Sequence, residues 1–237
     1  MSLAVESMIP RVEYKYLIGR ERFVILKDLC DHLLTRDPND HGTGYPVHSV
    51  YFDTQGYDYY HEKIHGEYFH RKARLRTYGL RPFSGPSYFE IKYKYHDDGY
   101  KSRVRIPDQV SLLDLGHRIQ MASYQNHVIL GNRAIFPVCS VFYQRKAYYL
   151  IGQAGTVRLN LDFDIACGFE GHHHDDYEPL FPDGEVVLEV KADHRGYLTD
   201  LTEILTLAEK GRTTFSKYIS CMNVFYSHYL MEIPHEF

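Results

Sequence analysis

The stretch FEIKYKYHDDGYKSRVRI, residues 89–106, alternates apolar and charged side chains on both sides of a polar centre, which predicts a β-hairpin. Asp98-Gly99 is a two-residue turn signal, because a type I′ turn needs a positive φ at both central positions. Counting outward from this turn pairs cation with cation, Lys94 with Arg103 and Lys92 with Arg105. Like charges directly opposite one another cost a strand pair roughly 0.2–1 kcal/mol. The hairpin therefore predicts a charged face that an ordinary solvated sheet would not favour.

Charged side chains also line one face of the other expected strands, which include residues 11–18, 67–80, 155–169 and 185–193. Strand side chains alternate between two faces, so odd and even positions separate the faces. The charged faces carry Glu13 and Lys15; Lys72, Arg74 and Arg76; Glu90, Lys92 and Lys94; Lys101, Arg103 and Arg105; Arg158, Asn160, Asp162 and Asp164; and Glu189 and Lys191. The opposite faces are mostly apolar, so each of these strands is expected to be half-buried.

Two arrangements could place such faces. For any one strand, the solvated side of an open sheet is the ordinary interpretation. A solvated face mixes charges of both signs, however, whereas residues 67–80 and both hairpin arms are mainly cationic. A closed or nearly closed barrel explains this better, with its charged faces turned inward around a polyanion and its apolar faces outward under helices. Triphosphate or polyphosphate suits such a tunnel, because Arg and Lys are the usual phosphate ligands.

Composition narrows the class of protein further. The 237 residues carry a formal net charge of −4, which argues against a nucleic-acid partner bound by bulk charge. The four cysteines are far apart without CxxC spacing, which indicates free thiols in a reducing compartment. No stretch approaches the ~20 apolar residues that span a bilayer, and no signal peptide is recognisable. We expect a cytoplasmic α+β protein with one domain over residues 1–237.

Several motifs, taken in order, resemble one family. They are RVEYKY, the RLR of RKARLRTYG, FEIKYK followed by KSRVRI, FYQRKAYY, VRLNLD, VVLEVK and the final FSKY. Together they resemble the catalytic domain of the vacuolar transporter chaperone (VTC) polyphosphate polymerase, within the triphosphate tunnel metalloenzyme superfamily. The similarity spans roughly residues 10–226. It implies an antiparallel eight-stranded β-tunnel with helices packed outside it, which holds a triphosphate or polyphosphate and a divalent metal.

The resemblance also implies roles for individual residues. Those expected to act on the transferred phosphate are Lys15, Arg74, Arg76, Lys92, Arg145 and Arg158. Those expected to bind substrate phosphate are Lys101, Arg103, Tyr143, Lys191, Lys217 and Lys94. Glu189 is the expected ligand for Mn²⁺ or Mg²⁺. Glu13 and Glu90 are further candidates, and each of them could equally balance the charge of a neighbouring lysine. Arg11 stands where the wider superfamily has the first acid of its ExExK signature, so two glutamate ligands on this strand are not expected.

The expected activity is metal-dependent transfer of the γ-phosphoryl group of ATP to a growing polyphosphate chain. A triphosphatase, with water as the acceptor, and a non-catalytic polyphosphate-binding module would use the same tunnel. Transfer of a product across a membrane would need a separate membrane partner. The cluster GHHHDD at 171–176 is interpreted as a solvated loop, because adjacent residues cannot all point at one ion. Residues 44–54 are expected to form a strand that ends before a polar, tyrosine-rich turn, and Asp53 near the end of this strand is interpreted as a turn or helix cap.

Overall fold

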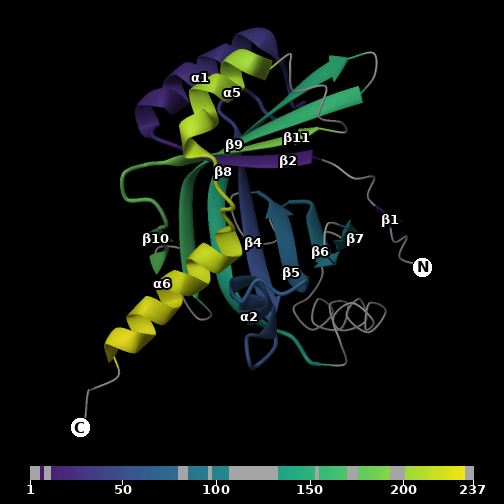
Figure 1. Cartoon of the computed structure of the whole chain (residues 1–237), viewed down its shortest axis with the longest axis vertical. Helices are drawn as coiled ribbons and strands as arrows, with labels where there is room; N and C mark the ends of the chain where they lie inside the picture. Colours follow the sequence, from purple (N-terminus) through teal and green to yellow (C-terminus); the bar gives the residue numbers. More distant parts are fainter. Residues whose placement is uncertain are drawn as a thin grey trace.

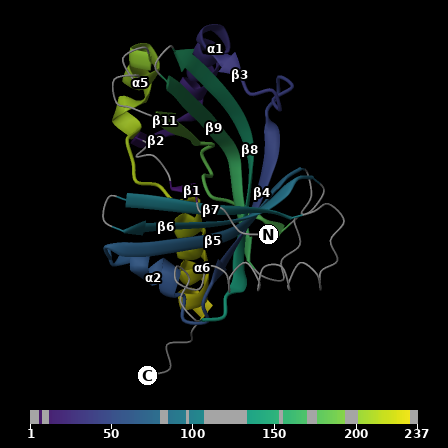
Figure 2. The same cartoon turned by 90° about the vertical axis from the view of Figure 1, so that its right-hand side faces the viewer.

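The computed structural model describes residues 6–7, 12–79, 85–95, 98–106, 133–152, 155–169, 176–192 and 201–232. Eight long antiparallel strands form a strongly curled sheet (Figures 1 and 2). They are β2 (Val12–Ile18), β4 (Tyr45–Asp53), β5 (Phe69–Tyr78), β6 (Ser87–Tyr95), β7 (Asp98–Ile106), β8 (Phe136–Gly152), β9 (Gly155–Phe169) and β11 (Val186–Ala192). Three two-residue strands complete the sheet: β1 (Glu6–Ser7), β3 (Thr35–Arg36) and β10 (Glu178–Pro179). The antiparallel eight-stranded architecture expected from the sequence is confirmed.

The sheet order is β1-β7-β6-β5-β4-β8-β9-β11-β2, with β10 beside β9 and β3 beside β8. The curl brings β2 and β11 across from β5 and β6, so that charged side chains from both ends of this order line one cavity. On the convex side, apolar side chains of β2, β8, β9 and β11 pack under α1 (Arg20–Leu33) and α5 (Thr202–Ala208). The period-two alternation therefore sorts core from cavity on these strands, as the sequence predicts.

The opening hairpin forms, but its expected register is wrong. Asp98 pairs with Tyr95 and Gly99 with Lys94, so the Asp-Gly pair lies within β7 instead of forming the turn. Lys92 faces Lys101, and Glu90 faces Arg103. The partner of each residue shifts by four positions, an even number, so every side chain keeps its expected face. The prediction of which face is charged is therefore independent of the error in register.

One helix departs from the expectation that helices pack outside the tunnel. α6 (Lys217–Glu232) packs on the concave side of the sheet, where Tyr218, Cys221 and Met222 join apolar side chains of β4, β8, β9 and β11. The concave face of β8 changes from polar at Arg145 to apolar at Val141. α6 covers the apolar part, and its first turn reaches the charged part.

A second helix, α2 (Asp58–Ile64), occurs where the sequence analysis expected a tyrosine-rich turn. Asp53 is fully buried and accepts hydrogen bonds from the backbone N–H groups of Thr54, Tyr59 and Tyr60, at 2.7, 3.0 and 2.9 Å. It also accepts a hydrogen bond from the Tyr218 hydroxyl of α6. Asp53 thus caps α2, as interpreted, and also ties it to α6. The local sequence DYYHEKI has little helical periodicity, so this anchored helix depends on tertiary contacts.

None of the helices in the described part of the chain is both long and apolar enough to cross a lipid bilayer. The histidine-rich residues 171–175 lie outside the described residues.

Candidate functional site

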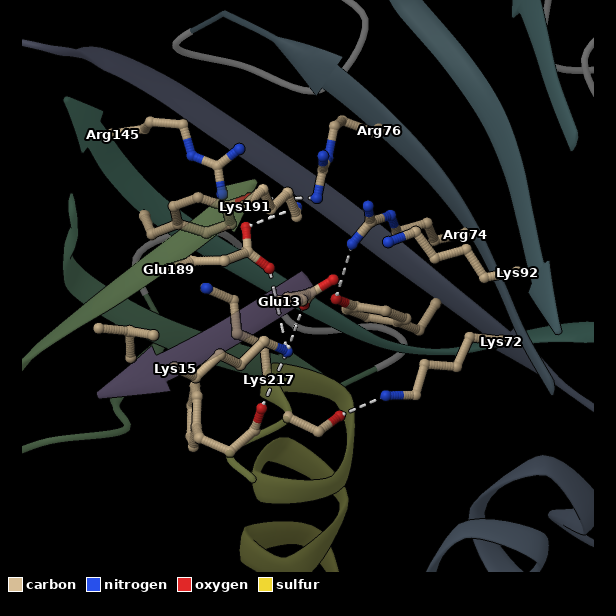
Figure 3. Close-up of a pocket in the computed structure, with 15 residues that line it drawn as sticks. Glu13, Lys15, Lys72, Arg74, Arg76, Lys92, Arg145, Glu189, Lys191 and Lys217 are labelled. Carbon is tan, nitrogen blue, oxygen red and sulfur yellow. Dashed lines mark hydrogen bonds and ion pairs between the residues drawn. The ribbon is translucent and has the colours of Figure 1, made fainter. Parts of the chain in front are cut away.

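A cavity on the concave side collects basic residues from five strands and the first turn of α6 (Figure 3). Eight of its lining residues are Lys or Arg and two are Glu: Lys15, Lys72, Arg74, Arg76, Lys92, Arg145, Lys191, Lys217, Glu13 and Glu189. Tyr51, Tyr143, Val187, Phe215 and Ser216 complete the lining. Such a concentration of cations in one partly enclosed site indicates an anionic ligand.

The structure brings together ten of the residues that the sequence analysis assigned to the site. They are Lys15, Arg74, Arg76, Lys92, Tyr143, Arg145, Lys191, Lys217, Glu13 and Glu189. They come from β2, β5, β6, β8, β11 and α6, so the cavity exists only after the sheet has curled. Their roles in binding or catalysis remain predictions.

Four assigned residues do not line the cavity. Arg158 donates to Asn160 Oδ1 at 3.2 Å and its side chain is 37% exposed. Arg103 is 40% exposed and its guanidinium stacks on the Tyr88 ring at 3.6 Å. Lys101 forms an ion pair with Glu90 at 2.7 Å, and Lys94 lies at the exposed end of β6. The assigned roles of these four residues also remain predictions.

The buried carboxylate of Glu90 lies close to four cations, two of which line the cavity. Its carboxylate lies 2.7 Å from Arg74 and from Lys101, 3.4 Å from Arg103 and 3.8 Å from Arg76. Burial would raise the pKa of Glu90, but the charges of Arg74, Arg76 and Lys101 outweigh it and hold that pKa well below its usual range. Glu90 therefore acts as a fixed counter-ion that positions the two cavity arginines.

Asp162 on β9 is a second fixed counter-ion for residues that line the cavity. It is fully buried and accepts from Arg145 Nε at 2.6 Å and Nη2 at 2.8 Å, and from Lys217 Nζ at 2.6 Å. Burial opposes ionisation, but the charges of Arg145 and Lys217 prevail and lower the pKa of Asp162 to about 2. This carboxylate fixes a strand residue and a helix residue side by side.

Two cavity lysines lack such a counter-ion. Within the described ranges, no carboxylate oxygen lies within 4 Å of Lys72 or Lys92, whereas Lys15 lies 3.3 Å from Glu13. Lys72 donates to Ser216 Oγ at 2.8 Å, and it faces Lys92 directly in the β5–β6 ladder. Burial and then the charge of Lys191 lower the pKa of Lys92 to about 7. Burial and the charge of Lys15 lower the pKa of Lys72 well below its ordinary value. The side chains that line the cavity are therefore short of negative charge.

The VTC domain family matches residues 10–226 of the chain. The chain belongs to the VTC domain family. A comparison with curated proteins finds no match. The fold of this VTC domain also occurs in solved structures of proteins named as candidate adenylate cyclases. One, from Bacillus halodurans, has a TM-score of 0.53 and 13% identity, covering 87% of this chain and 95% of its own. Another, from Vibrio parahaemolyticus, has a TM-score of 0.50 and 13% identity, covering 90% and 97%.

A third structure is a candidate adenylyl cyclase from Hippeastrum whose title names a dominant triphosphatase activity. Its TM-score is 0.52 at 12% identity, over 90% of this chain and 96% of its own. At such low identities the three structures establish only a shared tunnel-like fold with the VTC domain.

The acidic residues of the VTC domain cavity fit a hard divalent cation with few protein ligands. Glu189 accepts from Asn160 Nδ2 at 3.2 Å and forms an ion pair with Lys191 at 2.8 Å; its other oxygen lies 4.0 Å from Lys15 Nζ. Glu13 lines the same cavity. No group of three or more potential metal ligands occurs among the described residues. Mg²⁺ or Mn²⁺ commonly uses one or two carboxylates with phosphate oxygens and water, so Glu189 and Glu13 are sufficient in chemistry and number.

Several residues that the geometry makes important were not among the predicted site residues. Lys72 and Asp162 lie on the predicted charged faces, so their alternation was the available signal. Of the two roles considered for Glu90, the structure shows charge balance, through its ion pair with Lys101. Ser216 precedes α6 and had no such signal, because its position depends on where α6 packs.

Proposed function

We propose that this VTC domain binds ATP or another triphosphate in the basic cavity and transfers the γ-phosphoryl group to a growing polyphosphate chain. The observation that carries the proposal is the pair of lysines, Lys72 and Lys92, that face each other without a carboxylate partner inside a cavity lined by eight Lys and Arg side chains. A bound polyanion relieves repulsion of this kind. Triphosphate and polyphosphate are polyanions that arginine guanidinium groups and lysine ammonium groups recognise.

In the proposed reaction, the bond between the γ-phosphorus and the bridging oxygen breaks, and ADP leaves with the electron pair. A terminal phosphate oxygen of the chain, already ionised, forms the new bond to phosphorus. Arg74, Arg76 and Arg145 hold the non-bridging oxygens, because Glu90 and Asp162 fix their guanidinium groups in place. Mn²⁺ or Mg²⁺, held by Glu189 and Glu13, would supply further positive charge to the phosphate oxygens.

Hydrolysis is the second candidate function, because water could replace the acceptor chain at the same cavity. The fold shared with the Hippeastrum protein, whose title names a triphosphatase activity, favours this alternative. A binding module without catalysis is the third, since the cations alone account for affinity.

Incubation with ATP and Mn²⁺ or Mg²⁺ separates these functions. We expect phosphate chains that migrate as a ladder on a polyacrylamide gel, together with ADP, and we expect Glu189→Gln to abolish both. Free phosphate without chains would favour the hydrolase, and tight triphosphate binding without any product would favour the binding module.

Replacement of Lys92 tests the cavity itself. We expect Lys92→Met to weaken triphosphate binding about 10- to 100-fold at pH 7, because one charge-assisted contact of about 1.5–3 kcal/mol is lost. The melting temperature should stay the same or rise, since no carboxylate loses its partner. Lys27→Met, on the convex helix α1, is the matched control and should bind triphosphate as the parent does. Equal affinities of the parent and Lys92→Met, measured by titration calorimetry, would contradict the proposed site.

A further inference from the structure

Basic side chains continue beyond the cavity toward α2. The concave face of β5 carries a row of basic residues at every second position: Arg76, Arg74, Lys72 and, at the end nearest the start of the strand, His70. In the β5–β6 ladder His70 lies opposite Lys94, as Lys72 lies opposite Lys92. A step of two residues along a strand covers about 7 Å. His70 and Lys94 therefore extend the row of basic side chains by one step past the cavity.

α2 adds a third basic group to this row. Lys63 is the penultimate residue of α2, and α2 is anchored because Asp53 caps its start and Glu62 binds Arg71. Burial and then the charge of Lys94 lower the pKa of Lys63. Burial and then the charges of Lys63 and Lys72 lower the pKa of His70. The neighbouring acid Glu62 is engaged with Arg71, and no other described carboxylate lies within 4 Å of Lys63. Lys63, Lys72 and Lys94 therefore place positive charge around His70, which offers its ring nitrogen atoms as hydrogen-bonding groups.

We propose that Lys63, His70 and Lys94 form a second anion subsite at the α2 end of the cavity, which binds the distal part of an inorganic polyphosphate chain whose end lies among the cavity cations. This proposal rests on the proposed function, because it assigns a direction to the same bound chain. Lys72 joins the two subsites, since it faces Lys92 on one side and places positive charge near Lys63 and His70 on the other. A triphosphate fills the cavity and leaves the outer subsite without a ligand.

Chain length is therefore the variable that tests the proposal. The double variant Lys63→Gln/His70→Gln is compared with the parent by titration calorimetry, with triphosphate and with polyphosphate of about 15 units as probes. We expect affinity for the longer chain to fall about tenfold, as for the loss of ionic contacts to phosphate oxygens, and triphosphate affinity to stay within about twofold. The salt dependence of long-chain binding should also become shallower. Lys27→Gln is the matched lysine control on the convex side and should change neither affinity.

The outcomes are distinct. Unchanged affinity for the longer chain, or an equal loss for both probes, would overturn the outer subsite while the cavity proposal stands, provided that Lys92→Met still weakens triphosphate binding. A parent protein that binds neither probe would overturn the cavity proposal and the outer subsite together.

A circular dichroism melting curve like that of the parent establishes that the double variant is folded. If it is not folded, the single Lys63→Gln variant serves for the same comparison, because Lys63 takes no part in the anchoring of α2.

Discussion

The affinity of the VTC domain for triphosphate is expected to fall about 50-fold between pH 7 and pH 9, if Lys92 alone takes up a proton on binding. In the protein without a bound anion, burial and the charges around Lys92 hold its pKa at about 7. A bound triphosphate provides the anionic partner that Lys92 lacks, so its pKa should return toward the ordinary lysine value of about 10.4. Binding above pH 7 then requires an added proton, and that requirement weakens binding as the pH rises.

The groups that face Lys92 from the surrounding strands support the predicted fall in affinity with rising pH. They are Lys72 and Arg74 on β5, Lys101 on β7, Lys191 and Glu189 on β11, and Glu13 on β2. The cations lower the pKa of Lys92 and the two glutamates raise it, but burial and the cations prevail. Lys72, whose pKa is also lowered, should add to the same slope.

Titration calorimetry in two buffers of different ionisation enthalpy measures the proton uptake directly. We expect uptake of about one proton at pH 8 for the parent. Lys92→Arg is the matched control, because a guanidinium stays charged across this range and should remove most of the uptake. Triphosphate itself gains charge as the pH rises, and the same control separates that contribution. Equal proton uptake by the parent and Lys92→Arg would contradict the prediction.

Removal of the Asp162 charge should have the largest effect on stability. In Asp162→Asn, Arg145 and Lys217 would remain buried without their acidic partner. Loss of one member of a buried ion pair costs about 3–5 kcal/mol in the free energy of unfolding. Urea denaturation measures this change. Asp164→Asn is the matched control on the same strand; Asp164 is exposed, and asparagine tolerates its positive φ of 49°, so we expect a change within about 0.5 kcal/mol.

The pH dependence of Asp162→Asn gives a second measurement. The pKa of Asp162 is about 2 in the folded protein and about 3.9 in the unfolded chain. A depressed folded pKa contributes stability that is present above the unfolded pKa and is lost as the pH falls through the folded value. The stability difference between the parent and the variant should therefore shrink as the pH falls from about 4 toward 2. A loss of under 1 kcal/mol at pH 7 would mean that solvent or ions reach Arg145 and Lys217 freely.

Much of the tunnel could be predicted because strand faces follow from local alternation. Lys15, Arg74, Lys92, Arg145 and Glu189 each point into the cavity as their odd or even position indicates. This prediction remains correct when the hairpin register is wrong, since an even shift preserves the face. The same alternation of side chains, together with the order of the motifs, predicted the eight-stranded fold and the family.

The partners of these side chains required the tertiary structure. Lys217 and Asp162 are 55 residues apart in the chain, and Lys72 and Ser216 are 144 apart, so neither contact leaves a local signal. The position of α6 on the concave side has the same cause, because Tyr218, Cys221 and Met222 pack against apolar side chains of strands that lie far from α6 in the sequence. The sequence by itself determined which residues face the cavity, since side-chain direction is a property of each strand. Only the tertiary structure decided which basic side chains have a carboxylate counter-ion and which lack one. Charge compensation depends on distances between strands and helices that come together only after the sheet curls.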